Sequence, residues 1–472
     1  MLATDLNCLK AQISKIPAVR RIGRVSGVKA GVIHVRGLAR HAAIGDQLVL
    51  TRQAGASLRG EVVRLEADEL IMLPDDPYEG VSLGDSVALC LPASIAPAEN
   101  WIGRVIDPYG RPLDGRPLLR GFVSRALQSP PPAPSQRRAL GARLNTGLAV
   151  MNTMLPIVRG QRLGLFAGSG VGKSSMLAHL AQNMQADVVV IALIGERGRE
   201  LRDFVEDTLG EKGMQRSVIV AATSDQSALA RRRCGWTAMA IAEYFRDQGQ
   251  QVLFLADSIT RFAEAHREVA VASGEAPALR GFPPSTAHMI MSLCERAGPG
   301  VPDQGDITAL FSVLVAGSDM DEPIADILRG VLDGHVVMDR SIAERGRYPA
   351  INLLRSVSRS LPGAANAQEN ALIAEARQLL GAYDRSEMMI RSGLYTPGND
   401  EILDRAVSVW AELDAFVGQT ETQGTDASFA KLQLLLRRAR ATQKPGRVLP
   451  STGRPSPGSQ QNKGNRPRIG QG

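Results

Sequence analysis

The strongest constraint on the fold is an apolar segment, residues 163–167, that leads directly into a glycine-rich loop and then into a helical stretch. The loop reads Gly168, Ser169, Gly170, Val171, Gly172, Lys173, Ser174 and Ser175. A phosphate needs several backbone N–H donors aimed inward, which requires positive φ at some positions and hence glycine, and the positive end of a helix favours its charge. The strand, the loop and the helix start together predict a P-loop.

Two side chains of this loop have expected roles. Lys173 would reach the β- and γ-phosphates of ATP, and the Ser174 hydroxyl would be a ligand of Mg²⁺. The usual pattern begins with glycine, and Ala167 holds that place here. Because a methyl group is the smallest possible addition, we expect the loop to keep its shape. The alternative is a glycine-rich turn of structural use only, and the flanking strand and helix disfavour it.

Two carboxylates follow other apolar runs. Asp257 comes directly after residues 252–256, where a carboxylate would hold magnesium or its water shell, although an ordinary helix cap would look the same. Glu196 follows the apolar run 188–194 and would orient the attacking water at the same edge of a parallel sheet. Taken alone, the charged cluster around Glu196 is more typical of a solvated loop.

The pattern of apolar residues divides the chain into regions. Short β-rich runs between residues 21 and 91, separated by Gly and Asp turns, predict a small antiparallel barrel. Apolar runs then alternate with helical stretches, which indicates parallel βαβ units, and the periodicity is helical after residue 366. We expect an α/β chain with these parts: an N-terminal amphipathic helix (1–20), a β-barrel (21–92), a P-loop domain with a mostly parallel sheet (93–365), a helical domain (366–442) and a disordered basic tail (443–472).

Both ends of the chain differ from the rest. At the N-terminus, helical spacing would align one apolar stripe formed by Leu2, Leu6, Leu9, Ile13 and Ile16. This stripe could pack on the protein's own next domain or dock a partner, and the pattern leaves both open. The tail after Gln443 carries positive charge without Asp or Glu and is rich in Pro, Gly, Ser and Gln, so we expect it to be disordered, with non-specific anion contact as its strongest role.

Composition excludes several classes of protein. Apolar runs are far shorter than the roughly 18 to 20 residues of a membrane span, and Asp5, Asn7 and Lys10 interrupt the N-terminal segment, so neither a membrane span nor a secretory signal is expected. We therefore predict a cytoplasmic protein. The formal net charge is +7, but six of these positive charges lie in the tail, which leaves the rest nearly neutral. No specific nucleic-acid partner is expected.

Several longer motifs resemble one known family. They are the segments GRVIDPYGRPLDG (103–115), GERGRE (195–200), DSITRFAEAHRE (257–268), GEAPALRGFPPS (274–285) and DMDEPIADILRGVLDG (319–334), together with the P-loop. The chain is thereby identified as a member of the rotary and secretion ATPase family, which includes the catalytic subunits of ATP synthases and the type III export ATPases. The resemblance implies a RecA-like P-loop domain, ATP and Mg²⁺ as cofactors, and ATP hydrolysis.

The resemblance also implies roles for individual residues. Glu196 becomes the carboxylate that orients water, Arg197 and Arg261 approach the γ-phosphate, and Tyr348 lies against adenine, although the sequence alone would place Tyr348 in the core. Arg359 matches the family's arginine finger, which would enter the site of a neighbouring subunit and stabilise charge on the transferring phosphoryl group. Without the resemblance, Arg359 would be taken for a solvated surface residue.

The segments 390–407 and 321–326 resemble the flagellar branch of the type III export ATPases most closely, and the injectisome branch is a near neighbour. For this branch the resemblance implies a homohexamer, a stator-like regulator on the N-terminal helix and a coiled-coil stalk protein in the central channel. It also implies export substrates with their chaperones, and peripheral association with the membrane export gate.

Other functions remain to be separated. A catalytic subunit of a proton-translocating ATP synthase would form rings with a second, homologous subunit. A hexameric nucleic-acid translocase is disfavoured because aromatic residues are only 4% and the folded part is nearly neutral. A nucleotide-sensing scaffold would bind ATP without turning it over, and replacement of Glu196 would separate it from an enzyme.

Overall fold

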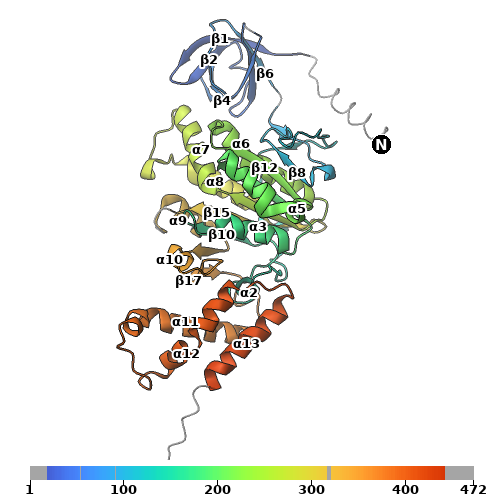
Figure 1. The fold of residues 1–472 in the computed structure, drawn as a ribbon. Helices are drawn as coiled ribbons and strands as arrows, with labels where there is room; N and C mark the ends of the chain where they lie inside the picture. The colour runs from blue at the N-terminus through green and yellow to red at the C-terminus, as the bar shows by residue number, and fades with distance from the viewer. Residues whose placement is uncertain (1–18, 54, 91, 316–319, 442–472) are drawn as a thin grey trace, which may run out of the picture.

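The computed structural model describes residues 19–441, apart from residues 54, 91 and 316–319. The expected N-terminal helix and the basic tail lie outside the described residues. Figure 1 shows three parts along one axis, with a β-barrel at one end, a sheet flanked by helices in the middle and a helical domain at the other end. These parts follow the order expected from the apolar pattern.

The barrel is closed by six antiparallel strands in the order β1-β2-β5-β4-β3-β6. Alternate side chains point inward, as period-2 patterning requires, and include Ile33, Val35 and Leu50. One side of the barrel packs on the central domain through Val63 and Ile71. The strands are β1 (Ile22–Lys29), β2 (Val32–Arg36), β3 (Gln47–Thr51), β4 (Ser57–Leu65), β5 (Glu69–Pro74) and β6 (Ser86–Leu89).

The central sheet has the order β17-β16-β10-β15-β13-β11-β12-β8, and all of its strands are parallel except β17 and the short β14, which pairs with β15. Its strands are β8 (Arg104–Ile106), β10 (Arg162–Ala167), β11 (Val188–Glu196), β12 (Ser217–Thr223), β13 (Val252–Asp257), β14 (Gly298–Pro299), β15 (Asp306–Leu314), β16 (Gly334–Met338) and β17 (Ile351–Ser358). The mostly parallel sheet is confirmed. Strands β8, β16 and β17 were not anticipated, because they are short or carry mixed polar residues.

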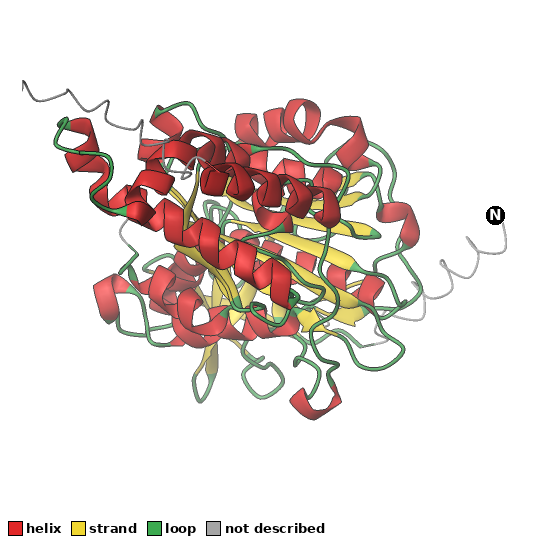
Figure 2. Cartoon of the chain, turned by 90° about the horizontal axis from the view of Figure 1, so that it is seen from below, coloured by secondary structure: helices red, strands yellow, loops and turns green. Residues whose placement is uncertain are grey.

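Helices cover both faces of this sheet (Figure 2). In β11, for example, Val189 and Ile191 join the core on one face, whereas Val190 and Ala192 join the core on the other. Burial of both faces explains why these strands read as continuous apolar runs. The helices are α3 (Lys173–Asn183), α4 (Gly198–Asp203), α5 (Gly210–Met214), α6 (Ala228–Arg246), α7 (Ile259–Ala272), α8 (Ser285–Arg296), α9 (Pro323–Val331) and α10 (Arg340–Glu344).

Three long helices form the C-terminal domain, and two of them, α12 and α13, pack on the short helix α2 (Ala149–Asn152). They are α11 (Ala367–Arg391), α12 (Glu401–Gly418) and α13 (Thr425–Ala441). Asn366 and Glu369 form a reciprocal capping box at the start of α11, and the Asp400 side chain caps α12. These caps fix where the two helices begin, and a loop that contains Gly393, Pro397 and Gly398 separates them.

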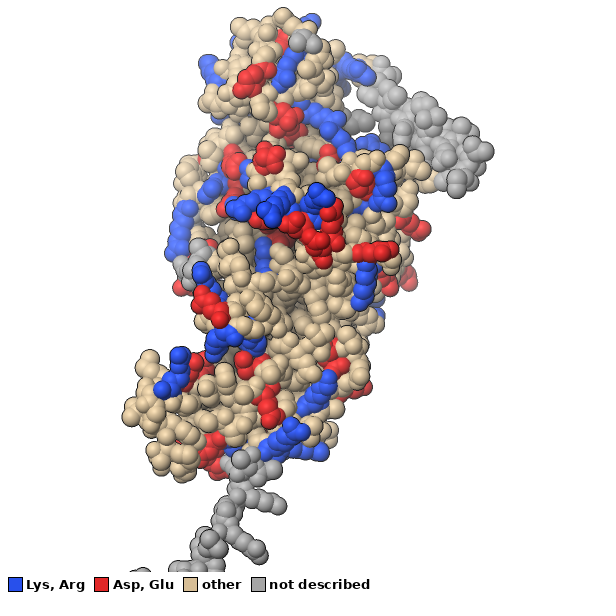
Figure 3. All heavy atoms as spheres, in the orientation of Figure 1, with Lys and Arg blue, Asp and Glu red and all other residues tan. Residues whose placement is uncertain are grey.

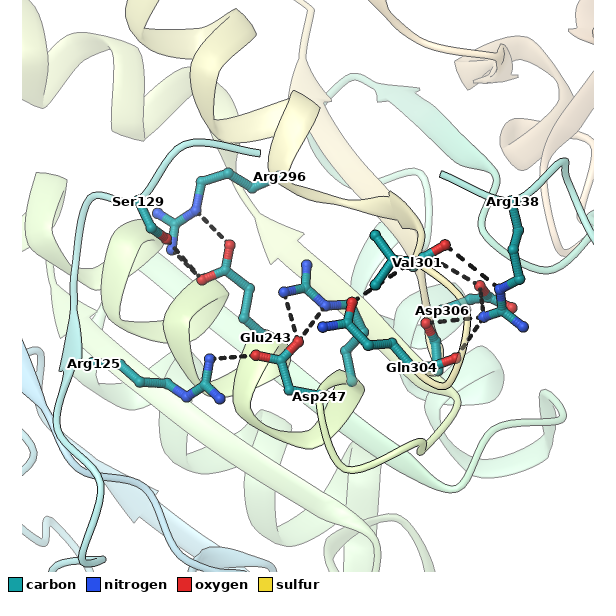
Figure 4. A network of polar contacts seen from close by, with 12 residues as sticks. Arg125, Ser129, Arg138, Glu243, Asp247, Arg296, Val301, Gln304 and Asp306 are labelled. Atoms are coloured by element: carbon teal, nitrogen blue, oxygen red, sulfur yellow. Dashed lines mark hydrogen bonds and ion pairs between the residues drawn. The ribbon is translucent and has the colours of Figure 1, made fainter. Parts of the chain in front are cut away.

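A network of ion pairs holds the linker between barrel and P-loop against the amino-terminal edge of the central sheet (Figure 4). Arg296 of α8 binds both carboxylate oxygens of Glu243 on α6, at 2.9 and 2.8 Å, and both side chains are at most 5% exposed. From the linker, Arg125 pairs with Asp247 at 2.6 Å. Each of these carboxylates has a guanidinium partner, so neither is left unpaired at this edge.

Candidate nucleotide site

The phosphate loop has the geometry that its glycines allow. Strand β10 ends at Ala167, and α3 begins at Lys173. Between them, Gly170 and Gly172 have φ values of 76° and 85°, in the left-handed region where a side chain is strained. Ala167 is the last residue of a regular strand and does not have positive φ, so its methyl group is accommodated without strain.

Strand order brings the expected site residues to one edge. Strands β10, β15, β13 and β11 are consecutive neighbours in the sheet and run parallel. The carboxyl ends of β10, β13 and β11 therefore lie side by side and present the P-loop, Asp257 and Glu196 at the same edge. This is the edge where ligands bind in open α/β sheets.

The side chains of these three strand ends converge. Lys173 Nζ donates a hydrogen bond to Asp257, and it lies 3.8 Å from Glu196 Oε1. Asp257 is nearly fully buried and accepts a second hydrogen bond at 2.7 Å from Ser312 Oγ on β15. One lysine thus serves two carboxylates, which leaves the cluster with an excess of negative charge.

This electrostatic environment changes the acidity of Glu196. Burial and the neighbouring charge of Asp257 raise the pKa of Glu196 to about 7, although Lys173 acts in the opposite direction. A carboxyl group whose pKa lies near the working pH can accept a proton or orient a water that loses one. The site therefore holds the type of group that hydrolysis requires.

The donor set also fits a nucleotide with its magnesium. Ser174 and Asp257 offer hard oxygen atoms, with Ser174 exposed in the first turn of α3. No group of three or more His, Cys, Asp or Glu side chains suited to a metal occurs among the described residues. Mg²⁺ commonly takes only one or two carboxylates and completes its shell with phosphates and water. A cation that arrives with the triphosphate matches these residues better than a metal in an all-protein cage.

Arg261 and Arg197 occupy different environments. Arg261 lies against Gly195, where a Cβ would be 3.3 Å from the Arg261 Cβ, so its helix α7 packs directly beside the loop that carries Glu196. Arg197 begins α4, its side chain is 80% exposed, and it pairs with Glu200 at 3.0 Å. The structure thus brings Arg261 near the site and directs Arg197 to solvent. A γ-phosphate contact stays a prediction for both.

Tyr348 lies beside the P-loop and is not a core residue. Its side chain is 54% exposed, and a Cβ at Gly172 would be 3.2 Å from Cδ1 and 3.4 Å from Cε1 of the ring. An open aromatic face next to the start of α3 is a suitable platform for a base. Its contact with adenine stays a prediction.

Arg359 lies at the opposite edge of its own sheet. It follows β17, whose last residue, Ser358, pairs with Gly334 at the beginning of β16. Since β16 runs parallel to β10, this position is at the amino-terminal end of the strand that leads into the P-loop. The exposed Arg359 side chain donates to the Arg329 carbonyl at 3.0 Å. Action on another subunit's nucleotide stays a prediction for Arg359.

The sequence interpretation missed residues that support the site. Ser312 binds Asp257, and Thr260 Oγ1 accepts a hydrogen bond of 2.9 Å from the Leu314 amide. The only local signal for Ser312 is a hydroxyl that stands between the apolar residues Phe311 and Val313. A polar group in a buried strand requires a partner, but the sequence does not say which one.

Two family descriptions match this chain. Residues 147–358 match the ATP synthase alpha/beta family, nucleotide-binding domain. Residues 365–435 match the C-terminal domain of the type III secretion ATPase EscN. The first covers the P-loop and both carboxylates, and the second covers α11, α12 and the greater part of α13.

Curated relatives extend over most of the chain. The flagellum-specific ATP synthase of Caulobacter vibrioides is 44% identical over 91% of this chain and 99% of its own length. That of Salmonella typhimurium is 41% identical over 88% and 93%. The type 3 secretion system ATPase of Pseudomonas syringae is 41% identical over 86% and 92%.

A solved structure has the same architecture. The assembled ATPase EscN of enteropathogenic E. coli is 34% identical, with a TM-score of 0.80 over 88% of this chain and all of that chain. No helix in the described part of this chain combines the length and apolar character needed to cross a bilayer. The matched nucleotide-binding domain and the ATPase relatives establish the chain as an ATPase. The chain belongs to the ATP synthase alpha/beta family, in the group of flagellum-specific ATP synthases and type 3 secretion system ATPases.

Proposed function

We propose that this chain hydrolyses MgATP in a homohexameric ring and thereby energises the delivery and unfolding of substrates for flagellar type III protein export. The observation that carries the hydrolytic part is the convergence of Lys173, Asp257 and Glu196 at the carboxyl edge of the sheet, beside a P-loop. Relatives named flagellum-specific ATP synthases support the biological setting.

The residues of the site divide the work of hydrolysis. The P-loop amides and Lys173 bind the β- and γ-phosphates, and Lys173 exchanges its present contact with Asp257 for phosphate oxygens. Ser174 and Asp257 would hold Mg²⁺, which when bound neutralises charge on the phosphate oxygens. Glu196, with its raised pKa, orients the attacking water and accepts its proton. Tyr348 supports the adenine ring, and Arg261 and Arg197 approach the γ-phosphate.

Completion of the site requires a second subunit. Arg359 lies at the far edge of its own sheet, so in a ring it would face the γ-phosphate of the neighbouring copy. The similar ATPase EscN is described as assembled, and also in complex with its central stalk EscO. We infer a homohexamer with a coiled-coil stalk protein in its channel.

Further partners follow from the export role. A stator-like regulator would bind the N-terminal helix, whose residues lie outside the described part of the chain. Export substrates with their chaperones would engage the ring, which would be cytoplasmic and peripheral at the membrane export gate. An injectisome export ATPase is the second candidate, because a type 3 secretion relative is 41% identical over 86% of this chain.

A secretion assay tests the proposal. A chromosomal Glu196→Gln allele should abolish hook and filament proteins in the culture medium and stop swimming, while the amount of the ATPase stays normal. Glu344→Gln, at an exposed pair on α10, is the matched control and should leave export unchanged. Loss of injectisome substrates with intact flagella would favour the second candidate. Rings formed only with a second, homologous subunit would indicate a synthase.

A further inference from the structure

The segment that carries Tyr348 is attached to the C-terminal helical domain. It connects α10 to β17, two elements of the nucleotide-binding domain. Arg345 pairs with Glu387 of α11 at 3.8 Å, and Arg347 Nε lies 3.0 Å from Asp414 Oδ1 on α12. Two ion pairs to another domain therefore lie within the three residues that precede Tyr348.

The Arg347 guanidinium makes three contacts, which together are called the Arg347 clamp. Its Nη1 donates to the Pro349 carbonyl at 2.9 Å, and its Nη2 donates to the Ile351 carbonyl at 2.7 Å. The third contact, to Asp414, comes from a different domain, and the Arg347 side chain is only 12% exposed. One guanidinium thus fixes the backbone that follows Tyr348 and ties it to α12. Lysine could not make all three contacts in one plane.

A second, independent observation is the close approach of α12 to the same backbone. A Cβ at Gly418, the last residue of α12, would lie 2.9 Å from the Tyr348 carbonyl oxygen and 3.3 Å from Arg347 Cγ. The absence of a side chain at Gly418 therefore lets the helix end rest directly against the Tyr348 segment. Contact and charge together would couple this segment to a movement of the C-terminal domain.

An adjacent cavity would allow such movement. It has a volume of about 510 Å³, and it is lined by Arg347 and Asp414 together with the neighbouring side chains Asn352, Trp410 and Val417. This space leaves room for a local shift of the Arg347 and Asp414 side chains.

We infer that Asp414 and Arg347 are positioning residues for nucleotide binding, through which the C-terminal domain sets the distance between Tyr348 and the P-loop. This inference rests on the proposed role of Tyr348 at the base. A shift of α12 moves Tyr348 toward or away from Gly172, so it changes the affinity for ATP more than the rate of the chemical step.

Hydrogen–deuterium exchange of the full-length, nucleotide-free chain tests the clamp itself. Asp414→Asn should increase exchange at residues 345–351 at least threefold, because the Asp414 charge no longer holds Arg347. The matched control is Glu412→Gln, two residues earlier on the exposed face of α12, which should leave this segment unchanged. Equal exchange in Asp414→Asn and parent would overturn the inference.

Steady-state kinetics test the role in binding. Asp414→Asn should raise the KM for ATP about five- to tenfold with kcat within twofold, and Asp414→Glu should restore part of the loss. The increase should disappear when Tyr348→Ala is already present, because both changes remove the same contact. An unchanged KM, or an increase that persists in the Tyr348→Ala background, would overturn the inference. If Tyr348→Ala alone left the KM unchanged, the proposed base contact would fail, whereas the exchange result would still report on the clamp.

Discussion

Carboxylates paired with basic side chains occur at both the amino edge and the carboxyl edge of the central sheet, but the two sets have different roles. At the amino edge, Glu243 is buried with a bidentate arginine of its own, Arg296. At the carboxyl edge, Glu196 and Asp257 share a single lysine, Lys173. A carboxylate with a guanidinium of its own is chemically quiet, whereas burial and the neighbouring charge of Asp257 raise the pKa of Glu196, and the shared Lys173 only partly offsets them. The difference shows that pairing, rather than burial alone, separates structural from reactive carboxylates.

The face of the molecule shown in Figure 3 is not dominated by either positive or negative side chains. On the face shown in Figure 3, acidic and basic side chains lie next to one another across all three parts. Paths of unbroken positive charge, which nucleic-acid translocases use, are not seen on this face. A local imbalance of charge occurs at the nucleotide edge, where Glu196 and Asp257 share Lys173.

The largest effect is expected for Arg359, which lies at the amino edge of its own sheet and is proposed to act at the nucleotide edge of a neighbouring subunit. Arg359→Ala should lower ATP turnover about 10³-fold while ATP still binds, because the transition state loses its cation. Mixing these subunits with inactive Lys173→Ala subunits should restore some activity, since an intact finger then meets an intact P-loop. Steady-state assays over a series of mixing ratios check this, and no recovery at any ratio would argue against action in trans.

A substitution at the amino edge should change the free energy of unfolding rather than ATP turnover. Glu243→Gln leaves the Arg296 guanidinium buried without its counter-charge, so we expect unfolding free energy to fall by about 3–5 kcal/mol. Denaturant titration measures this, with Glu344→Gln at an exposed pair as a control that should cost less than about 1 kcal/mol. A Glu243→Gln loss as small as that of the control would mean that the two edges do not differ as described.

The contribution of Glu196 to stability should depend on pH in the opposite direction to that of a carboxylate in a stabilising ion pair. The pKa of Glu196 is raised from 4.5 to about 7 in the folded state. The folded chain then holds an extra proton between these values, so the contribution of Glu196 to stability falls as pH rises through this window. Because the side chain has some solvent contact, we expect Glu196→Gln to be more stable than the parent by about 1 kcal/mol at pH 8 and by nearly nothing at pH 4. Thermal melts across this range measure it, and a Gln variant that is less stable at pH 8 would contradict the assignment.

The smallest effect is expected for Ser312, whose hydroxyl donates a hydrogen bond to Asp257. Ser312→Ala removes a hydrogen bond of 2.7 Å, so turnover should fall about two- to tenfold with little change in melting temperature. Ser312→Thr keeps the hydroxyl and serves as the control. A loss as large as that for Arg359→Ala would mean that Ser312 has a direct part in the reaction.

Local sequence patterns predicted most of the fold. The barrel strands and the apolar sheet strands β10, β11, β12, β13 and β15 follow from alternation and from continuous apolar runs, which depend only on neighbours in sequence. Strand β17 was missed because exposed and buried residues mix irregularly along it, and it runs antiparallel at the edge of the sheet. Edge strands bury less surface and therefore carry a weaker pattern.

Prediction of the site was uneven for the same reason. The P-loop is local, and Glu196 and Asp257 could be placed because they end continuous strands. Ser312 acts on Asp257 across 55 residues of sequence, and no local pattern encodes that contact. The roles of Tyr348 and Arg359 came only from the family resemblance, since a lone aromatic or a surface arginine has no distinguishing sequence signal.

The account depends most directly on Glu196 as the group that orients water. Steady-state turnover of Glu196→Gln, measured beside binding of a fluorescent ATP analogue, tests it. We predict that turnover falls at least about 10²-fold while the Kd for the analogue changes less than threefold, because the amide keeps the shape but cannot accept a proton. Turnover equal to that of the parent would contradict the account.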